Sequence, residues 1–381
     1  MKRKDKRTQE EENSNLPSVV GTRRNLRKQS KSKKKRIPII IGKVLIVVIL
    51  FAVLGVVVYG VKMMVDANKF LNDSYQPRET AVIEEQEKID VQKEPISILL
   101  LGLDDNDERD IGSARTDSMI LVTLNPQEEL VSLVSIPRDT YTTIEAPGYQ
   151  GKDKINAAFA HGGIDTTIET VSNLMDVPIN FYATADFQAF EDIVDALGGV
   201  EIDVPFTLTE QNAKGEKVVD LKEGRHNLNG EEALAFARTR YVDNDVERGK
   251  RQQQVLEAIA QKAMSAGSIA KYKSILNALD GHITTDMPSN KILSVAQSGL
   301  TKDYKFDSYV FSWMSYDYMP YGEPISMVGL HQDSIDYISH RLRRSLDLDE
   351  PDERDEPGFV FESNGIIDPG TYPTDGYAVD N

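Results

Sequence analysis

The chain has 381 residues, of which 28% are charged and none is cysteine, so disulfides and thiolate chemistry are excluded. Its formal net charge of −17 is unevenly distributed. Residues 1–43 carry fifteen Lys and Arg against four acidic residues, a net +11, which leaves −28 for everything that follows. Such an asymmetry is typical of a basic tail joined to an acidic domain, or of a chain with segments on two sides of a membrane.

An apolar run from Ile39 to Val61 follows the basic segment, and Lys43 is its one charged residue. A transmembrane helix needs roughly 17–25 residues, and this run provides them. Lys and Arg concentrate before the run, so the positive-inside bias predicts a cytoplasmic N-terminus and an extracellular remainder. A cleaved signal peptide is the alternative, but the run is long for one and no small-residue cleavage site follows it. We expect a single-pass protein of the cell membrane, with a cytoplasmic tail over 1–38 and a transmembrane helix over 39–61.

Polar and charged residues at positions 62–94 predict an extracellular stalk, and a domain with core signals follows over residues 95–348. Three strands are predicted near the start of this domain, because short apolar runs there are bounded by turn or charged residues. They are Ile96–Leu103, Ser118–Leu124 and Leu130–Ile136.

Helices alternate with strands in the rest of the domain. Asp165, Asp186 and Asn229 each precede an apolar-periodic segment, and such side chains accept the first backbone N–H groups of a helix. This alternation predicts an α/β domain, with a mixed central β-sheet flanked by helices. The predicted elements are helices from these caps to Leu174, Leu197 and Arg238, a strand over Val200–Val204, and a long helix from Arg248 to Met264.

The last segment, residues 349–381, is rich in Asp, Glu, Pro and Gly and has few apolar side chains. A segment of this composition cannot bury enough apolar surface to fold by itself. We therefore predict a disordered acidic tail after residue 348.

Several common catalytic sites are absent from the sequence. There is no GxxxxGK[ST] phosphate loop, no HExxH zinc helix and no GxSxG nucleophile elbow. The five scattered histidines are a poor supply for a histidine metal site or a serine triad. What remains is a set of Asp and Arg residues at the ends of predicted elements.

These Asp and Arg residues stand at the termini of the three predicted strands. Asp104 follows the first strand, Arg115 and Asp117 immediately precede the second, and Arg138 follows the third. The termini of adjacent strands converge at one edge of a sheet, where ligands of α/β proteins bind. Asp104 and Asp117 are then placed to share a hard cation, Mg²⁺ or Mn²⁺, because such ions take carboxylates together with substrate phosphates as ligands.

A second cluster lies in the segment ARTRYVDNDVERGKRQQQ, residues 237–254. Because a helix is expected to end near Arg238, the side chains of Arg238 and Arg240 can reach one anion. Arg248, Arg251 and Gln252 lie within about one turn of the following helix and form another donor face. Arginine's planar fork suits paired phosphate oxygens, and an anionic substrate requires such a local positive site in an acidic domain.

Seven segments of the chain resemble, in the same order, motifs of the LytR–CpsA–Psr glycopolymer transferases of Gram-positive bacteria. The short basic tail and the single anchor are also similar to that family. The segments are ILLLGLD (98–104), RTDSMILVTLNP (115–126), VSIPRDTY (134–141), KINAAFAHGG (154–163), FEDIVDALGGVEIDV (190–204), LNGEEALAFARTR (228–240) and ERGKRQQQV (247–255).

The resemblance implies the LytR–CpsA–Psr fold and a transferase reaction. A phosphate-linked glycopolymer, such as wall teichoic acid or capsule, would move from a polyprenyl-pyrophosphate carrier to a muramic acid hydroxyl of peptidoglycan. Asp104 and Asp117 would hold Mg²⁺ against the pyrophosphate, one of them also taking the hydroxyl proton, and apolar helices would enclose the polyprenyl tail. The residues implied to bind the pyrophosphate oxygens are Arg115, Arg138, Arg238, Arg240, Arg248, Arg251 and Gln252.

Three alternatives remain open: a hydrolase of the same lipid, a non-catalytic wall anchor, and a membrane-bound transcription regulator. The basic tail has no helix-turn-helix pattern and topology explains its charge, so no nucleic-acid partner is expected. The chain departs from the family at Glu247, where a glycine is often found, and this carboxylate stands beside Arg248.

Overall fold

The structure is a computed structural model, and it describes residues 60–103, 116–211, 218–239, 245–318, 324–363 and 367–368. The predicted cytoplasmic tail and nearly all of the predicted transmembrane helix therefore lie outside the described residues. Within the described ranges, none of the helices combines the length and the apolar character that crossing a bilayer requires.

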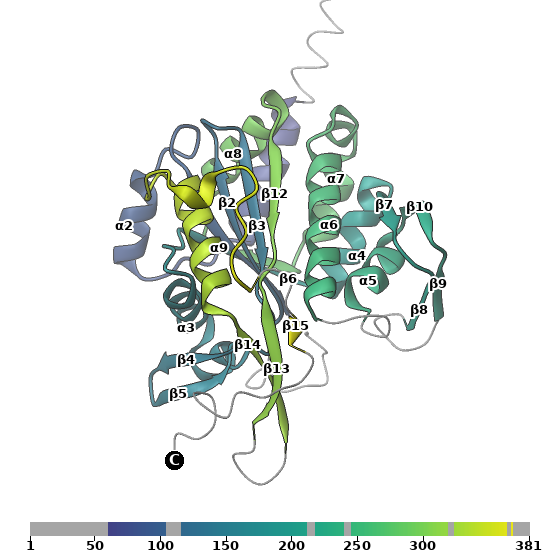
Figure 1. Ribbon diagram of the computed structural model, residues 1–381. Coiled ribbons are helices and arrows are strands. Elements are labelled where there is room, and N and C mark those ends of the chain that lie inside the picture. Colours follow the sequence, from purple (N-terminus) through teal and green to yellow (C-terminus); the bar gives the residue numbers. More distant parts are fainter. Residues whose placement is uncertain are drawn as a thin grey trace, which may run out of the picture. The chain divides into compact units, whose positions relative to one another are not determined.

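A six-stranded sheet forms the centre of the domain (Figure 1), in the order β11-β6-β1-β2-β3-β12. β1 runs parallel to β6 and β3 runs parallel to β12, whereas the other neighbours are antiparallel. The predicted mixed sheet is thus confirmed. The strands span Ile283–Thr285 (β11), Phe181–Asp186 (β6), Ile96–Leu103 (β1), Thr116–Asn125 (β2), Leu130–Ser135 (β3) and Lys305–Tyr309 (β12).

Helices cover both faces of this sheet, which explains why β1 is apolar without alternation. Leu99 and Leu101 point to one face, where they pack against α3 (Ala157–Met175) and α9 (Gln332–Ser345). Leu100 points to the other face, which α6 (Asp245–Ala263) covers through Leu256. The sheet is therefore the middle layer of three.

A second hydrophobic core lies beyond α6 and is shared by two further helices and two short sheets. The predicted caps of these helices are confirmed: Asp186 accepts from Ala189 N, and Asn229 forms a capping box with Glu232. The elements are α4 (Phe187–Leu197), α5 (Gly230–Arg238), the pair β7 (Val200–Val204) and β10 (Gly224–Leu228), and the pair β8 (Leu208–Gln211) and β9 (Val218–Leu221).

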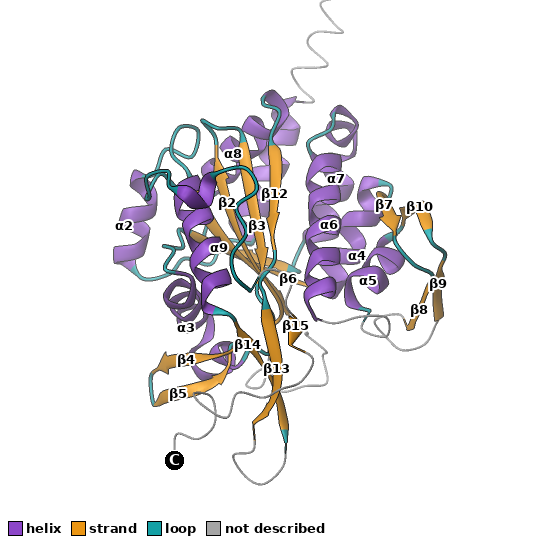
Figure 2. Cartoon of the chain, in the orientation of Figure 1, coloured by secondary structure: helices purple, strands orange, loops and turns teal. Residues whose placement is uncertain are grey.

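The remaining elements surround the sheet, and Figure 2 distinguishes its strands from the helices around it. A β-hairpin of two strands and a three-stranded sheet lie next to each other, joined by a bridge between Thr140 and Val328. These elements are β4 (Tyr141–Ala146), β5 (Tyr149–Lys154), β13 (Trp313–Tyr318), β14 (Ile325–Leu330), β15 (Ile367–Asp368), α2 (Thr80–Lys88), α7 (Ala266–Leu279), α8 (Ser289–Thr301) and a short 3₁₀ helix over Glu353–Asp355.

The start of α3 differs from the prediction. The helix begins at Ala157 instead of near Asp165, and it is broken at Gly162 and Gly163, whose backbone is not helical. Gly163 has a φ of +69°, which suits glycine. Asp165 lies just past this break, where it accepts a hydrogen bond from Arg78 Nε at 2.7 Å instead of capping the helix.

The acidic tail also differs from the prediction, because residues 349–363 pack on α9. The imidazole of buried His340 lies between Asp349 and Asp355, at 3.2 and 2.9 Å, and Arg341 pairs with Asp355 at 2.7 Å. Phe359 stacks on Tyr337. The prediction of disorder is corrected for this part, since the basic end of α9 supplies the partners that the tail itself lacks. The later tail residues, apart from β15, are outside the described ranges.

Candidate active site

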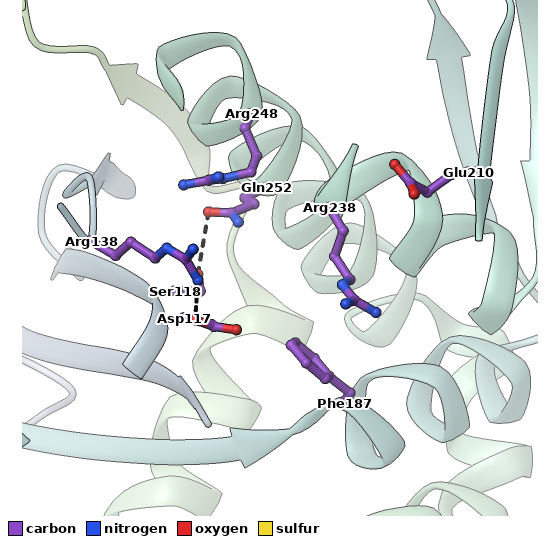
Figure 3. Close-up of a pocket in the computed structure, with 8 residues that line it drawn as sticks. All are labelled: Asp117, Ser118, Arg138, Phe187, Glu210, Arg238, Arg248 and Gln252. Atoms are coloured by element: carbon purple, nitrogen blue, oxygen red, sulfur yellow. Dashed lines mark hydrogen bonds and ion pairs between the residues drawn. The ribbon is translucent and has the colours of Figure 1, made fainter. Parts of the chain in front are cut away.

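A cavity of about 540 Å³ opens at the ends of β2 and β3, between the central sheet and the second core. Side chains from six parts of the fold line it, as Figure 3 shows. The lining residues are Asp117, Ser118, Arg138, Phe187, Glu210, Arg238, Arg248 and Gln252. Five of these eight are residues that the sequence predicted for the site, so the structure brings the two predicted clusters together.

Asp117 and Arg138 form the centre of one wall. Asp117 lies at the start of β2 and Arg138 follows β3, and these strands are antiparallel neighbours. Arg138 donates a hydrogen bond from Nη1 to Asp117 Oδ1, and both side chains are about one quarter exposed. The convergence expected from the strand termini is therefore found for these two residues.

Arg138 forms a second ion pair, with Asp139. Arg138 Nε lies 3.9 Å from Asp139 Oδ2, and the other oxygen of Asp139 accepts from Lys154 Nζ at 2.8 Å. The backbone carbonyl of Arg138 accepts from Asn156 N at 3.2 Å. The guanidinium of Arg138 is thus hydrogen-bonded to Asp117 and lies within ion-pair distance of Asp139.

Arg248 and Gln252 reach the cavity from α6, one turn apart. Gln252 Oε1 accepts hydrogen bonds from Ser118 at 3.3 Å and Ser135 at 3.4 Å, so it ties α6 to β2 and β3. The close approach of these elements depends on Gly249, where a Cβ would lie 3.1 Å from the Ser135 side chain. Glycine after Arg248 therefore lets the helix bring its donors to the edge of the sheet.

Arg238 enters from the end of α5. The helix stops there, as predicted, since the backbone of Thr239 is not helical, with φ −55° and ψ 138°. The guanidinium carbon of Arg238 lies 4.7 Å from the ring centre of Phe187, a cation–π distance. Phe187 is the first residue of α4, so this contact joins the ends of two helices at the cavity.

Arg251 has a different place from the one that the sequence predicted. Its side chain is buried, and it donates to the carbonyl oxygens of Phe236 at 3.0 Å and Thr239 at 2.6 Å. These carbonyls belong to the C-terminal end of α5, which lacks partners within the helix. Arg251 does not line the cavity, and instead fixes the helix end that presents Arg238.

The other predicted site residues, Asp104, Arg115 and Arg240, lie outside the described residues. Glu247, the departure from the family pattern, accepts from Lys250 Nζ at 2.5 Å. It does not line the cavity. The extra carboxylate therefore has a cationic partner of its own one turn away.

Glu210 and Ser118 are lining residues that the sequence analysis did not single out. Glu210 lies on β8, a four-residue strand whose weak alternation gave no signal. Figure 3 shows its carboxylate on the wall that carries Arg238, opposite Asp117. The sequence alone could not assign Glu210 to the basic cavity, because its position there depends on where β8 lies in the fold.

An apolar cavity of about 260 Å³ adjoins the polar one. The two share the lining residues Ser118, Phe187, Arg238 and Gln252. Away from this junction most lining side chains are aliphatic or aromatic, with Thr184 and Asp186 as polar exceptions. The apolar ones come from β1, β6, α4, α5, α6 and β11 and include Leu100, Ala183, Phe190, Leu234, Leu256 and Ile283. On α4, Phe187 and Phe190 line this cavity, and Phe190 also packs against the second core, to which Val194 belongs.

Asp186, which lines the apolar cavity, forms a titratable pair with His282. His282 Nδ1 is 2.6 Å from Asp186 Oδ2, and Asp186 caps α4 beside Phe187. The hydrogen bond that the imidazole donates to this carboxylate raises the pKa of His282 above its ordinary value of 6.5. The pair joins β11 to the first turn of α4.

Comparisons with known proteins agree with this geometry. The model of the LytR_cpsA_psr family matches residues 59–342. A Bacillus subtilis protein named polyisoprenyl-teichoic acid–peptidoglycan teichoic acid transferase TagT is 33% identical over 325 residues, which cover 84% of this chain and 97% of the relative. A TagU of the same description from Enterococcus faecalis is 34% identical and is covered over 82% of its length. Two further relatives, from Staphylococcus aureus and B. subtilis, are matched over only about half of their length, 54% and 56%.

Solved structures are similar as well. The crystal structure of B. subtilis TagV has a TM-score of 0.59 at 33% identity, over 68% of this chain and 99% of that one. TagT bound to LIIa-WTA has a TM-score of 0.55 at 32% identity, over 68% and 94%. TagT with bound octaprenyl pyrophosphate lipid has a TM-score of 0.51 at 31% identity, over 68% and 93%. The order of the motifs, the fold and the family match together show that this chain is a member of the LytR–CpsA–Psr family.

Proposed function

We propose that this protein transfers a phosphate-linked glycopolymer, of the teichoic acid or capsule class, from a polyprenyl-pyrophosphate carrier to a muramic acid hydroxyl of peptidoglycan. The observation that carries the proposal is the junction of a cavity lined by arginines with an apolar cavity. A polyprenyl pyrophosphate has the same division, with an anionic head joined to an apolar tail. The names of TagT and TagU, and the lipid bound to TagT, support the same substrate class.

The charges of the polar cavity suit the pyrophosphate. Arg138, Arg238 and Arg248 face it from three different elements, against the carboxylates of Asp117 and Glu210. Arginine donors placed on several sides are able to bind non-bridging oxygens of both phosphates. In a domain of net negative charge, such a site selects the anionic head of the lipid.

Asp117 fits a divalent metal, because Arg138 engages only its Oδ1 while the side chain lines the cavity. Asp117, with the Asp104 expected beside it, would hold Mg²⁺ or Mn²⁺, and the metal would supply positive charge to the pyrophosphate. Arg138 then has two tasks: it orients Asp117 and it donates to a phosphate oxygen.

The reaction is a phosphoryl transfer that depends on positioning and charge neutralisation. The acceptor hydroxyl oxygen attacks the polymer-side phosphorus, and the bond from that phosphorus to the bridging oxygen breaks. Polyprenyl phosphate leaves with the bond electrons, and the hydroxyl proton passes to a carboxylate of the site, Asp117 or Asp104. Arg238 and Arg248 neutralise charge that develops on the leaving phosphate.

The apolar run before the domain implies where this happens. We propose a single-pass protein of the cell membrane, with its N-terminus in the cytoplasm and its catalytic domain outside. Both substrates of the proposed reaction, the lipid carrier and peptidoglycan, are present on that side.

The test is a transfer assay with the full chain in proteoliposomes, a lipid-linked glycopolymer labelled in its sugars, nascent peptidoglycan and Mg²⁺. Label should move to peptidoglycan, and both EDTA and Asp117→Ala should abolish the transfer. Release of the polymer without attachment would instead identify a hydrolase. Tight binding of the lipid without turnover would identify a wall anchor.

A further inference from the structure

The segment that was predicted as a stalk, residues 62–94, is hydrogen-bonded to the edge of the central sheet. Thr285 of β11 donates from its N–H to Ser74 O at 3.0 Å and accepts from Gln76 N at 2.8 Å. Tyr75 forms a parallel bridge to the same residue. The polar composition of the segment did not indicate these contacts, which are made by its backbone.

This edge belongs to the wall of the apolar cavity. β11 pairs with β6, and Ile283 of β11 lines the cavity together with Ala183, Thr184 and Ala185 of β6. The chain that leaves the predicted membrane anchor is therefore fastened, within about fifteen residues, to a strand of that wall. Between the anchor and Ser74 the chain is helical over residues 62–73, which at 1.5 Å per helical residue spans roughly 18 Å.

Buried hydrogen bonds join the rest of the segment to the domain. Asp286, which is fully buried, accepts hydrogen bonds from Gln86 Nε2 at 2.7 Å and from Tyr182 N at 2.8 Å. Gln86 also donates to Asn180 O at 2.7 Å. Lys291 of α8 reaches the end of α2 and donates to Ile89 O at 2.5 Å. The segment is thus part of the domain.

The helix over residues 60–73 has one side against the domain and another that faces solvent. Leu71 and Ser74, near its end, are buried. Val61, Met64 and Val65 are 58%, 59% and 61% exposed, and their spacing of three and four residues places them on one face. Of seven large hydrophobic side chains exposed in the described part of the chain, three lie on this single turn.

We propose that Val61, Met64 and Val65 form a membrane-contact face, seated at the boundary between headgroups and acyl chains of a phospholipid bilayer. The proposed occupant is a bilayer because the face begins where the apolar run Ile39–Val61 ends, and because exposed Lys62 and Lys69 flank it, as is typical of interfacial helices. The contact holds the β11–β6 wall close to the bilayer, so that a polyprenyl tail reaches the apolar cavity without crossing water. This inference rests on the proposed membrane location and lipid substrate.

The absence of cysteine from the chain allows a direct test. Met64→Cys and, as control, Val360→Cys are labelled with an environment-sensitive fluorophore in the full chain, reconstituted in phosphatidylcholine–phosphatidylglycerol vesicles. Val360 is a matched control because it is apolar and 64% exposed. The probe at 64 should emit further to the blue, be quenched by lipids spin-labelled near the headgroup, and be at least threefold less accessible to aqueous iodide than the probe at 360. Equal iodide quenching at both positions would overturn the proposal.

A second measurement separates this face from the reaction itself. The triple variant Val61→Ser, Met64→Ser and Val65→Ser should transfer polymer from a long-chain lipid in the bilayer at least fivefold more slowly, and use a short-chain soluble analogue at the wild-type rate. Equal loss with both substrates, or no loss with either, would contradict the membrane-contact role. If the wild-type protein transfers neither substrate, the proposed function fails, whereas the fluorescence result still decides the contact face.

Discussion

Arg138 and Asp117 are hydrogen-bonded to each other on one wall of the polar cavity, from Nη1 to Oδ1. Each carries a charge that the other compensates, and both remain about one quarter exposed. The pair therefore presents one remaining carboxylate oxygen and several guanidinium donors to a substrate, a combination suited to a phosphate with its metal.

Replacement of Arg138 should slow the transfer strongly without unfolding the domain. Arg138→Ala removes a donor to the transferred phosphate and leaves Asp117 without its partner, so we expect kcat to fall by about 10²–10³-fold. Arg138→Lys should recover only part of the rate, because an ammonium cannot contact both groups with a planar fork. Arg225→Ala is the control, since Arg225 forms an exposed pair with Glu201 away from the cavity. A rate for Arg138→Ala within twofold of this control would contradict the assignment.

Replacement of Arg251 should lower stability, whereas replacement of Arg238 should weaken lipid binding. Arg251→Met removes two buried hydrogen bonds to the end of α5, so the free energy of unfolding should fall by about 3 kcal/mol. Arg238→Ala should leave stability within about 0.5 kcal/mol and weaken binding of the pyrophosphate lipid. Urea unfolding and lipid binding are measured for both variants. Unchanged stability of Arg251→Met with abolished binding would place Arg251 in the site after all.

Glu210 should oppose the binding of the anionic lipid head. Glu210→Gln removes a negative charge from the cavity wall, and we expect affinity for polyprenyl pyrophosphate to rise about threefold to tenfold, more at low salt than at high salt. Glu223→Gln is the control, because Glu223 is an exposed carboxylate next to β9. Weaker binding of the Glu210 variant would show that this carboxylate instead assists the substrate or its metal.

The pair of His282 and Asp186 should make stability depend on pH. The pKa of His282 is raised in the folded state, so the stabilisation is fully present below its ordinary value of 6.5 and is lost as the pH rises through the higher folded-state pKa. The free energy of unfolding of wild type should exceed that of His282→Gln by about 0.5 kcal/mol at low pH, a small value because solvent screens this partly exposed pair. The difference should vanish at alkaline pH. A difference that grows with pH would contradict this sign.

The acidic segment after α9 should contribute to stability. Truncation after Leu348 exposes the buried His340 and leaves Arg341 without Asp355, so we expect the midpoint of thermal unfolding to fall by several degrees. Truncation after Asp368 keeps these contacts and should leave the midpoint unchanged. If both truncated proteins have the same midpoint of thermal unfolding as the wild type, the segment does not stabilise the domain.

The sequence predicted those features that depend on neighbouring residues. β1 and α5 begin and end where the apolar run, the Asn229 cap and the following residues place them. Asp117 and Arg138 meet because their strands are adjacent in both sequence and sheet. Local patterns are sufficient for such contacts.

Contacts between distant segments could not be predicted in this way. Arg248 and Arg251 are separated by less than one helical turn, yet one lines the cavity and the other binds α5, and spacing alone does not say which side meets which element. Likewise, Glu210 reaches the cavity only through the placement of β8. The composition of residues 349–363 indicates a solvated tail, and only the cationic side chains of α9 provide partners for its carboxylates. Gln86 has a structural role only because it contacts Asp286, 200 positions away.

The proposed transfer is tested most directly by following the polymer-side phosphorus atom. A polyprenyl-pyrophosphate glycopolymer carrying ³²P only in the polymer-side phosphate is incubated with the full chain, Mg²⁺ and peptidoglycan, beside the Arg138→Ala variant. The proposed transfer predicts that ³²P becomes covalently bound to peptidoglycan through a muramic acid phosphodiester, at a rate at least 10²-fold higher with wild type than with the variant. Phosphorus label that stays with the lipid, or that leaves with unattached polymer, would contradict it.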